Sequence, residues 1–326
     1  MSTTFYHQIA ANKRQSLFLA VAVAAILGVF GFVIGFALTG RPEGGIVATV
    51  IAVLVAALSS IGSYMAGDKL VLATSQAREV DEQTAPQLMN VVREISIAAG
   101  VPPPRVYVIE DSAPNAFATG RDPEHASVAV TTGLLEKMDR EELQGVLGHE
   151  LSHVRNYDIR FTLLVGVLVG SVALLSDFFL RWTFWFGGGR SSNDRDRGGG
   201  GGLQALFFIL AIVLSILAPI ASRLVQLAVS RQREFLADAS SVEVTRNPQG
   251  LERALEKIAM DRDVLEVASR ATQHLYFTNP IKKFEARASG LMSTHPPIVE
   301  RVNRLRELTG ERPLDSNEAA VLSGLD

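Results

Sequence analysis

The sequence contains no cysteine. This absence excludes a disulfide framework, a thiolate metal site and a cysteine nucleophile. Any metal ion bound by this chain must therefore be held by histidine, aspartate or glutamate. Histidine is itself scarce, with six residues in 326, so two histidines at ligand spacing are informative.

Charged residues are also few. They make up 20% of the chain, whereas 48% of the residues are hydrophobic and the mean hydropathy is +0.21. The hydrophobic residues gather in a few long runs, which is typical of a membrane protein rather than of a large soluble core. A formal net charge of −3 and the lack of a basic face give no reason to expect a nucleic-acid partner.

Two apolar runs stand near the amino terminus, at Leu17–Leu38 and Ile46–Met65. The first is longer than the core of a signal peptide, and each matches the roughly 20 residues that cross a bilayer. They predict a transmembrane hairpin; the alternative is a buried helical hairpin inside a globular domain. Basic residues flank the pair on both sides, which places both outer ends in the cytoplasm by the positive-inside rule. The flanking residues are Lys13, Arg14, Lys69 and Arg78.

Two further apolar runs, Phe161–Leu175 and Leu203–Ile220, enclose a low-complexity segment at 187–202 that is rich in Gly, Ser, Asp and Arg. We predict that these runs form a second pair of spans. Spanning would place the arginines of the loop outside, against the charge rule. A helical hairpin packed on the domain or lying in the interface is therefore the alternative.

The sequence between and after the apolar runs has the composition of soluble segments. We divide the chain into an amino-terminal hairpin at 1–67, an α/β segment at 68–160, a second hydrophobic hairpin at 161–222 and a mainly helical segment at 223–326. The periodicity, caps and turn residues predict the following elements. They are a helix at Thr84–Ala99, strands at Arg105–Glu110 and Ser127–Thr131, a helix after Met138 capped by Asp139, a helix at Pro296–Leu308 and a mobile acidic tail at Ser316–Asp326.

The helix after Met138 contains the motif His149-Glu150-Leu151-Ser152-His153. Residues four apart share one face of a helix, so both imidazoles can bind one zinc ion. Zinc lowers the pKa of a bound water towards about 7, and Glu150 is placed to take the proton of that water. The alternative is an exposed His–Glu–His face, which the apolar residues of this helix disfavour because packed histidines need partners.

A catalytic zinc site needs three protein ligands and an open position. The best candidate for the third ligand lies at 231–238, directly after the fourth apolar run. Glu234 and Asp238 again share a face, so Glu234 can bind the metal while Asp238 accepts a hydrogen bond from a ligand imidazole. Alone, this segment would be interpreted as a solvated charged helix; beside the histidine pair, the metal interpretation is preferred.

HELSH at 149–153 together with REFLAD at 233–238 resembles the HtpX heat-shock membrane proteases, relatives of the CAAX prenyl endoproteases in the gluzincin group. The resemblance covers nearly the whole chain, including NAFATG at 115–120, TTGLL at 131–135 and STHPP at 293–297. It implies a single Zn²⁺ ion held by His149, His153 and Glu234, with Glu150 as the catalytic base and Asp238 supporting a ligand histidine. It also implies a mainly α integral membrane protein with four candidate transmembrane helices and a gluzincin-like α+β cytoplasmic domain that contains a small β-sheet.

Three other positions match the family. His295 can donate a hydrogen bond to the oxyanion of the tetrahedral intermediate, or can cap the helix that starts at Pro296. Arg301 would hold that region near the site and contribute to substrate binding. Asn115 and the strand at Val128–Thr131 would line a substrate channel where a peptide adds as an extra strand; Asn115 can equally be only a turn residue.

The remaining histidines, His7, His125 and His274, show no ligand spacing, and Asp158 is interpreted as structural.

These features predict a zinc endopeptidase that cleaves membrane or misfolded polypeptides in protein quality control. The predicted location is multi-pass in a bacterial inner membrane, with lipid contact, a cytoplasmic active site and a role in stress response that rests on the resemblance alone. One alternative is an enzyme that trims prenylated carboxyl termini, which would need a lipid chamber walled by more spans. Another is a non-proteolytic chaperone with a structural zinc, which would need a fourth protein ligand. A transporter is disfavoured because the first two runs contain no ionisable residue. The oligomeric state stays open.

Overall fold

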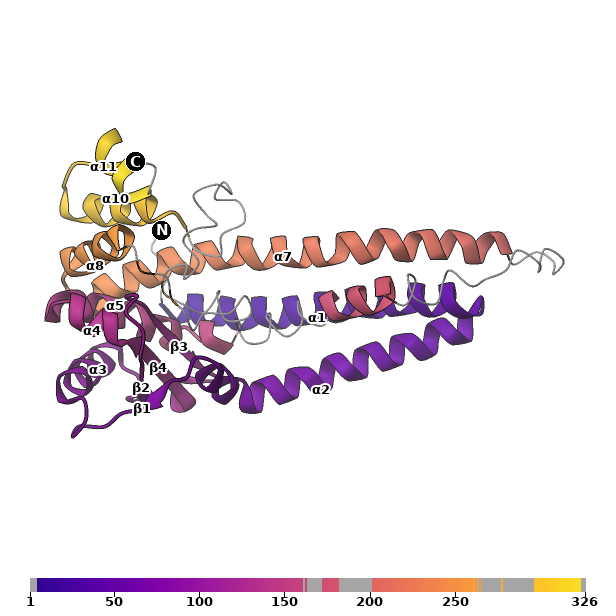
Figure 1. Ribbon diagram of the computed structural model, residues 1–326, viewed down its shortest axis with the longest axis horizontal. Coiled ribbons are helices and arrows are strands. Elements are labelled where there is room, and N and C mark those ends of the chain that lie inside the picture. The colour runs from indigo at the N-terminus through magenta and orange to yellow at the C-terminus, as the bar shows by residue number, and fades with distance from the viewer. Residues whose placement is uncertain are drawn as a thin grey trace. The chain divides into compact units, whose positions relative to one another are not determined.

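The structure is a computed structural model that describes residues 5–160, 162, 172–181, 201–261, 263, 265, 277 and 296–323. Within these residues the chain is mainly helical and contains one small mixed sheet (Figure 1). It divides into two compact units. Unit 1 comprises 1–12, 65–163 and 227–326, and unit 2 comprises 13–64 and 164–226.

The sheet of unit 1 has four strands in the order β1-β2-β4-β3. Their bounds are β1 Arg78–Glu79, β2 Arg105–Ile109, β3 Ala116–Gly120 and β4 Ala126–Thr131. The β-branched residues of β2 and β4 suit a buried pleated surface, and these strands pair in parallel with Val106 opposite Val128. β3 runs antiparallel to β4 and forms the edge of the sheet.

This order corrects one prediction. Val128–Thr131 was expected to receive a peptide as an added strand, but β4 lies inside the sheet, between β2 and β3. Its backbone groups are used by two neighbours, so no further strand can pair with it. The edge available on this side belongs to β3, a strand whose Ala-Phe-Ala-Thr-Gly sequence lacks the alternation by which strands are recognised.

Helix α5, Arg140–Arg155, carries the HELSH motif, and its start follows from local chemistry. The Asp139 side chain accepts a hydrogen bond from the Glu142 amide, and the Glu142 side chain accepts one from the Asp139 amide. This capping box confirms the predicted cap and fixes where the helix begins. The apolar face of α5 packs on α3, α8 and β3.

Two close approaches hold α5 against its neighbours. A Cβ on Gly145 would lie 2.7 Å from the Leu251 amide nitrogen of α8, Pro248–Met260. A Cβ on Gly148 would lie 2.8 Å from Ser241 Oγ of α7, Gly201–Thr245. The Ser241 hydroxyl also donates to the Gly145 carbonyl at 2.7 Å. Small residues therefore let the carboxyl-terminal part of α7 lie directly beside the motif helix.

The remaining predictions for unit 1 hold, with one exception. The strands and the helices α3, Pro86–Ala99, and α10, Ile298–Thr309, form where expected, and α3 ends at the left-handed Gly100. Two short elements, η1 at Pro123–His125 and α4 at Thr132–Lys137, complete the unit. The predicted mobile tail is instead partly helical, as α11 at Ser316–Ser323. The reason is that Asp315 caps its first amides and Arg312 pairs with Glu318.

Unit 2 is built from α1, Phe5–Thr39, after its first eight residues, the adjoining part of α2, Pro42–Thr74, the described residues 172–181 and the amino-terminal part of α7. Gly40 has φ of 68° in the turn between α1 and α2, a backbone conformation that favours glycine. The Phe36 and Phe207 rings join α1 to α7 with centroids 4.4 Å apart.

The four spans predicted from the sequence are not confirmed. In the part of the chain that the structure describes, no helix is both long and apolar enough to cross a membrane. The runs at Leu17–Leu38, Ile46–Met65 and Leu203–Ile220 do form helix, within α1, α2 and α7. Most of Phe161–Leu175 and the segment 187–202 lie outside the described residues.

Candidate metal centre

His149, His153 and Glu234 come together in unit 1, although 81 residues separate the last two in sequence (234 − 153). One ligand atom from each lies within 4.8 Å of the others. The two Nε2 atoms are 3.1 Å apart, and the Glu234 oxygens lie 3.5 Å from His149 Nε2 and 3.6 Å from His153 Nε2. Within the described part of the chain, no other group of three or more histidines and carboxylates lies close enough together to hold a metal ion.

The His149 ring is held from behind by a carboxylate. Its Nδ1 lies 2.8 Å from Asp238 Oδ1, one turn beyond Glu234 on α7. Arg301 donates to the same carboxylate, from Nε to Oδ2 at 2.9 Å and from Nη2 to Oδ1 at 2.6 Å. Burial would raise the pKa of Asp238, but the Arg301 charge and the His149 hydrogen bond outweigh it, so this pKa is lowered.

The His153 ring has a matching partner that the sequence interpretation treated as structural. Its Nδ1 lies 3.1 Å from Asp158 Oδ2, and Asp158 Oδ1 accepts a hydrogen bond from Arg233 Nη1 at 2.8 Å. Burial lowers the pKa of His153, but the Asp158 hydrogen bond and the charges of Glu234, Asp158 and Glu150 raise it to about 9. An outer carboxylate thus serves each of the two imidazoles.

The arrangement of the imidazole nitrogens fits a bound cation. A carboxylate only accepts hydrogen bonds, so each Nδ1 that faces an aspartate carries a ring proton, and the neutral form of each ring presents a lone pair at Nε2. Both lone pairs and the Glu234 carboxylate therefore converge on one point. Such groups repel one another unless a cation lies among them.

The separations also suit zinc. With metal–ligand bonds of about 2.0–2.1 Å, the ligands of a tetrahedral zinc lie about 3.3 Å apart. The two Nε2 atoms, 3.1 Å apart, are close to that distance, and the Glu234 carboxylate faces both of them, with Oε2 3.5 Å from His149 Nε2 and Oε1 3.6 Å from His153 Nε2. The donor set of two imidazoles and one carboxylate is a set that catalytic zinc sites use. The His153 side chain is 15% exposed, so the cluster has an opening to solvent.

Glu150 lies beside the cluster and is 2% exposed. The backbone of Ala118, in edge strand β3, faces its carboxylate and favours the charged form. Burial raises the pKa of Glu150, although the two histidines oppose this effect. A raised carboxylate pKa brings this group closer to the range in which it can both accept and return a proton near neutral pH.

Phe277 is a further residue of this region that the sequence did not indicate. Its amide donates to the Ala116 carbonyl of β3 at 2.7 Å. Its ring packs edge-on against His149 with centroids 4.8 Å apart, and Arg301 Nη1 donates to its carbonyl at 3.3 Å. Phe277 belongs to no motif and has no regular spacing from the ligand residues, so the sequence could not predict its position beside His149.

The remaining residues singled out from the sequence do not belong to the group of three ligands. Asn115 is 3% exposed at the start of β3, where its carbonyl accepts from the Thr131 amide at 3.0 Å. Arg301 is 1% exposed and contacts Asp238 rather than solvent. His295 and His274 lie outside the described residues.

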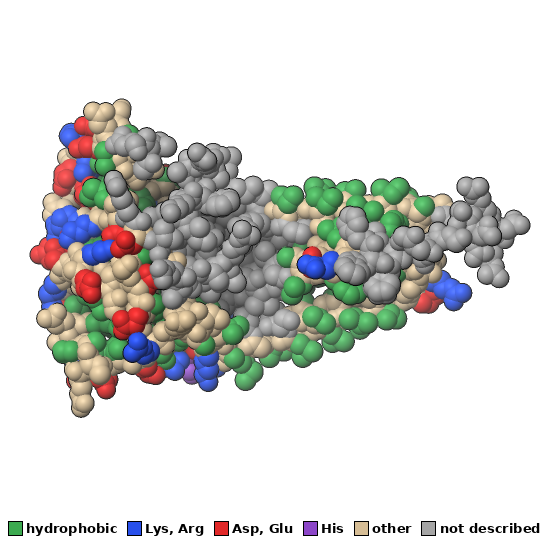
Figure 2. Space-filling view, in the orientation of Figure 1, with side chains coloured by type: hydrophobic (Ala, Val, Ile, Leu, Met, Phe, Trp, Pro, Cys, Tyr) green, Lys and Arg blue, Asp and Glu red, His purple; other side chains and the backbone are tan. Residues whose placement is uncertain are grey.

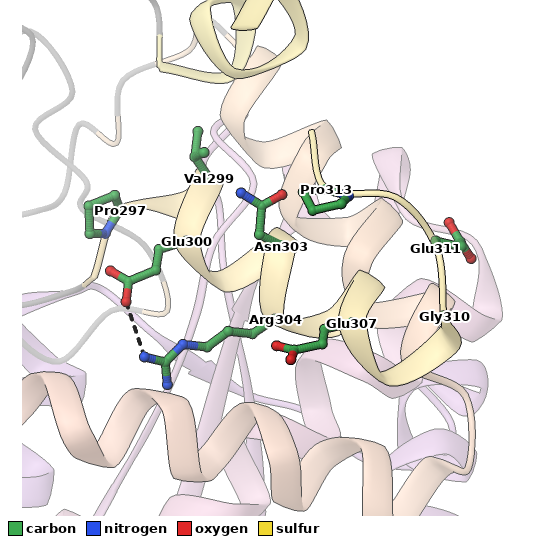
Figure 3. Close-up of a pocket in the computed structure, with 9 residues that line it drawn as sticks. All are labelled: Pro297, Val299, Glu300, Asn303, Arg304, Glu307, Gly310, Glu311 and Pro313. Atoms are coloured by element: carbon green, nitrogen blue, oxygen red, sulfur yellow. Dashed lines mark hydrogen bonds and ion pairs between the residues drawn. The ribbon is translucent and has the colours of Figure 1, made fainter. Parts of the chain in front are cut away.

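A cavity of about 670 Å³ lies beside α10 and is lined by residues between Pro297 and Pro313 (Figure 3). Glu300 and Arg304 line it and form an ion pair at 3.1 Å. None of the residues that converge on the metal cluster lines this cavity. It is therefore not the candidate site.

Comparison with known proteins agrees with this geometry. Residues 82–309 match Peptidase family M48. A protein named protease HtpX homolog from Streptococcus gordonii is 47% identical over 303 residues, which cover 93% of this chain and 99% of the relative. A protein of the same name from Listeria monocytogenes is 42% identical over 306 residues, with the same coverage of both chains.

The crystal structure of S. mikatae Ste24p has a similar fold. The TM-score is 0.50 at 19% sequence identity, and the match covers 91% of this chain and 66% of that chain. At this identity the likeness concerns the fold alone.

Proposed function

The chain belongs to peptidase family M48 and is a zinc metalloprotease, and we propose that it cleaves internal peptide bonds of membrane or misfolded proteins at the cytoplasmic face of a membrane. The observation that carries this proposal is the convergence of His149, His153 and Glu234 beside Glu150 in a buried part of unit 1. The relatives of this chain that are named protease HtpX homolog support the proteolytic activity.

In this proposal His149, His153 and Glu234 hold one zinc ion. When bound, zinc supplies Lewis acidity, which activates water and polarises a peptide carbonyl. Glu150 then accepts the proton of the attacking water and returns it to the leaving amine. We assign hydrogen-bond donation to the oxyanion to His295, and substrate contact to Asn115.

The surface of unit 2 supports a membrane location. Large apolar side chains are exposed along its helices, among them Phe18 at 73%, Leu58 at 68% and Ile209 at 60%. Figure 2 shows such side chains following α2 and α7. Extended apolar surface of this kind indicates contact with lipid or with another protein. We propose that lipid covers it, with 1–67 and 161–222 as the two membrane hairpins.

The orientation follows from charge and from the continuity of α7. Lys13 and Arg14 in the first part of α1 and Lys69 near the end of α2 favour a cytoplasmic location for the chain ends of the hairpin. Glu234 lies 14 residues beyond Ile220 (234 − 220), about four turns along the same helix. The metal centre would then lie near the membrane surface, where proteins embedded in or leaving the bilayer are within reach.

The decisive experiment replaces Glu150 with Gln. The variant should retain one zinc ion per chain and should cleave casein about 10²–10⁴-fold more slowly, because proton transfer is lost while the ligands remain. Glu141→Gln is the matched control, since Glu141 lies on the same helix but is exposed and pairs with Arg253. Unchanged cleavage by Glu150→Gln would refute the assignment of the base.

Orientation has a separate test. Reporter proteins fused after Arg78 and within 187–202 should report from the cytoplasm and from the outside, respectively. A fusion after Arg78 that reports from outside would overturn the cytoplasmic location of the metal centre, whatever the result with Glu150.

A further inference from the structure

We infer that Asp158 and Arg233 form a positioning pair for His153, matching the pair of Asp238 and Arg301 that holds His149. The inference rests on the proposed zinc site and adds two residues to it. Neither residue contacts the space between the ligand atoms, so both would act through the His153 ring. The metal centre would then be supported by two chains of the order arginine, aspartate, histidine.

The two chains have closely similar contacts. In the first, Asp238 lies 2.8 Å from His149 Nδ1, and Arg301 donates to both carboxylate oxygens. In the second, Asp158 offers Oδ2 to His153 Nδ1 at 3.1 Å and Oδ1 to Arg233 Nη1 at 2.8 Å. In each chain one aspartate thus connects an arginine to the ring nitrogen that faces away from the cluster.

Burial indicates that the second chain is more than a surface ion pair. Asp158 is 2% exposed and Arg233 is 7% exposed. Removing two charges from water is unfavourable unless good geometry compensates for it. A different Asp–His pair in the same unit, Asp122 with His125 at 2.6 Å, has a ring that is 54% exposed and lies outside the cluster.

The backbone after α5 is shaped to bring Asp158 back to the ring. A helix turns by about 100° per residue, so a residue five positions after His153 would point roughly 140° away from it. Here α5 ends at Arg155, and Tyr157 adopts φ of 61°, a left-handed conformation that is uncommon for a tyrosine. After this turn the Asp158 carboxylate lies against His153 Nδ1.

The pair also connects the two segments that carry the ligands. Arg233 precedes Glu234 on α7, whereas Asp158 follows the helix that carries His153. Their ion pair therefore fixes the ring of the second ligand relative to the backbone of the third. It also holds the proton of His153 on Nδ1, which directs the lone pair of Nε2 into the cluster and makes the ring a stronger ligand.

The test compares Asp158→Asn with Asp122→Asn in the full chain purified in detergent. Zinc affinity is measured by competition with a chelator, and ligand geometry by the visible absorption of the Co²⁺-substituted protein. Asp158→Asn should weaken zinc binding about 10–100-fold and alter the cobalt spectrum. Asp122→Asn should leave both unchanged, because its histidine is not in the cluster. Parent-like affinity and an unchanged cobalt spectrum in Asp158→Asn would overturn the inference.

A second variant covers the case in which Asp158→Asn does not fold, as judged by circular dichroism. Arg233→Lys keeps the charge but loses the planar guanidinium, so it should weaken zinc binding less than Arg233→Gln does. Parent-like zinc affinity in Arg233→Gln would also overturn the inference. Failure of the proposed zinc site would look different, because the parent chain itself would then bind no zinc, and failure of the proposed proteolysis would show as a zinc-bound parent that does not cleave casein.

Discussion

Unit 1 holds several charged side chains in its interior, whereas unit 2 holds many large apolar side chains at its surface. In unit 1, Glu150, Asp238 and Arg301 are 2%, 5% and 1% exposed. In unit 2, Phe18 and Leu58 are 73% and 68% exposed. Both patterns reverse the ordinary distribution of residues in a water-soluble protein.

Each reversal has its own physical requirement. A buried charge must be paired and hydrogen-bonded, and in unit 1 the aspartates, arginines and histidines of the centre meet that requirement with one another. An exposed apolar surface cannot be satisfied by contacts within the unit, so lipid or another protein must cover it. Buried charged residues therefore indicate a functional site within unit 1, and exposed apolar side chains indicate what surrounds unit 2. The following predictions test each half of this comparison.

The largest effect should come from removing one partner of the buried ion pair. Asp238→Ala leaves the Arg301 charge buried without its carboxylate, which should lower the free energy of unfolding by about 3–5 kcal/mol. Denaturant titration of the full chain in detergent measures this change. Asp315→Ala, at an exposed aspartate that caps the short helix α11, is the control and should lose only about 1 kcal/mol. A loss no larger than that of the control would show that the centre does not depend on internal pairing.

The same pair sets the response to acid. The pKa of Asp238 is lowered in the folded protein from its ordinary value of 3.8. Its contribution to stability is therefore complete above the unfolded pKa and is lost as the pH falls through the lower folded pKa. Asp238→Ala should accordingly show a weaker dependence of stability on pH in the acid range than the parent.

The second prediction concerns the surface of unit 2. Leu58→Asp should disfavour insertion of this helix into a bilayer by about 3–4 kcal/mol, the difference between leucine and aspartate near the centre of a span. The measured quantity is the fraction of protein that resists alkaline extraction from membranes. Leu308→Asp is the matched control, because Leu308 is 61% exposed on α10 of unit 1. Equal extraction of the two variants would refute lipid as the cover of unit 2.

The third prediction separates metal from proton in the centre. In the metal-free protein the pKa of His153 is raised to about 9, above its ordinary value of 6.5. The resulting stabilisation is complete below pH 6.5 and is lost as the pH rises through 9. We expect a loss of roughly 1–3 kcal/mol between these values in chelator-treated protein.

Zinc should remove this dependence, because the metal takes the position of the proton on His153. Unfolding measured from pH 6 to 10, with and without zinc, tests the prediction. A metal-free protein whose stability does not fall over this range would contradict it. The His125→Gln variant, measured in parallel, accounts for the surface histidine that pairs with Asp122.

The parts of the fold and of the metal centre that depend on a few adjacent residues could be predicted from the sequence. The capping box of Asp139 and Glu142, the end of α3 at Gly100 and the spacing of His149 and His153 are all properties of a few adjacent residues. Glu234 was within reach because a second pair of acids at helical spacing follows an apolar run.

The roles that were missed depend on long-range or irregular geometry. Asp158 reaches His153 only through the left-handed turn at Tyr157, and helical spacing alone would direct it elsewhere. Arg301 meets Asp238 across 63 residues of sequence, so its role as an internal partner could not be derived from spacing. Edge strand β3 was missed because alanine and glycine give little strand signal.

The smallest effect should come from a charge that lies outside the centre but on the same helix. Asp139→Ala removes the cap of α5 and should lower the free energy of unfolding by about 1 kcal/mol, while Asp139→Ser, which can still accept from the Glu142 amide, should lose less. Zinc affinity should stay at the parent value in both variants, because the two histidine ligands lie about three to four turns further along α5 and are fixed by Asp238 and Asp158. Thermal unfolding and chelator competition give the two readouts. A fall in zinc affinity that parallels the fall in stability would mean that the metal centre depends on α5 as a whole. Such a result would weaken the contrast between the buried charges of the site and the exposed charges that only support the fold.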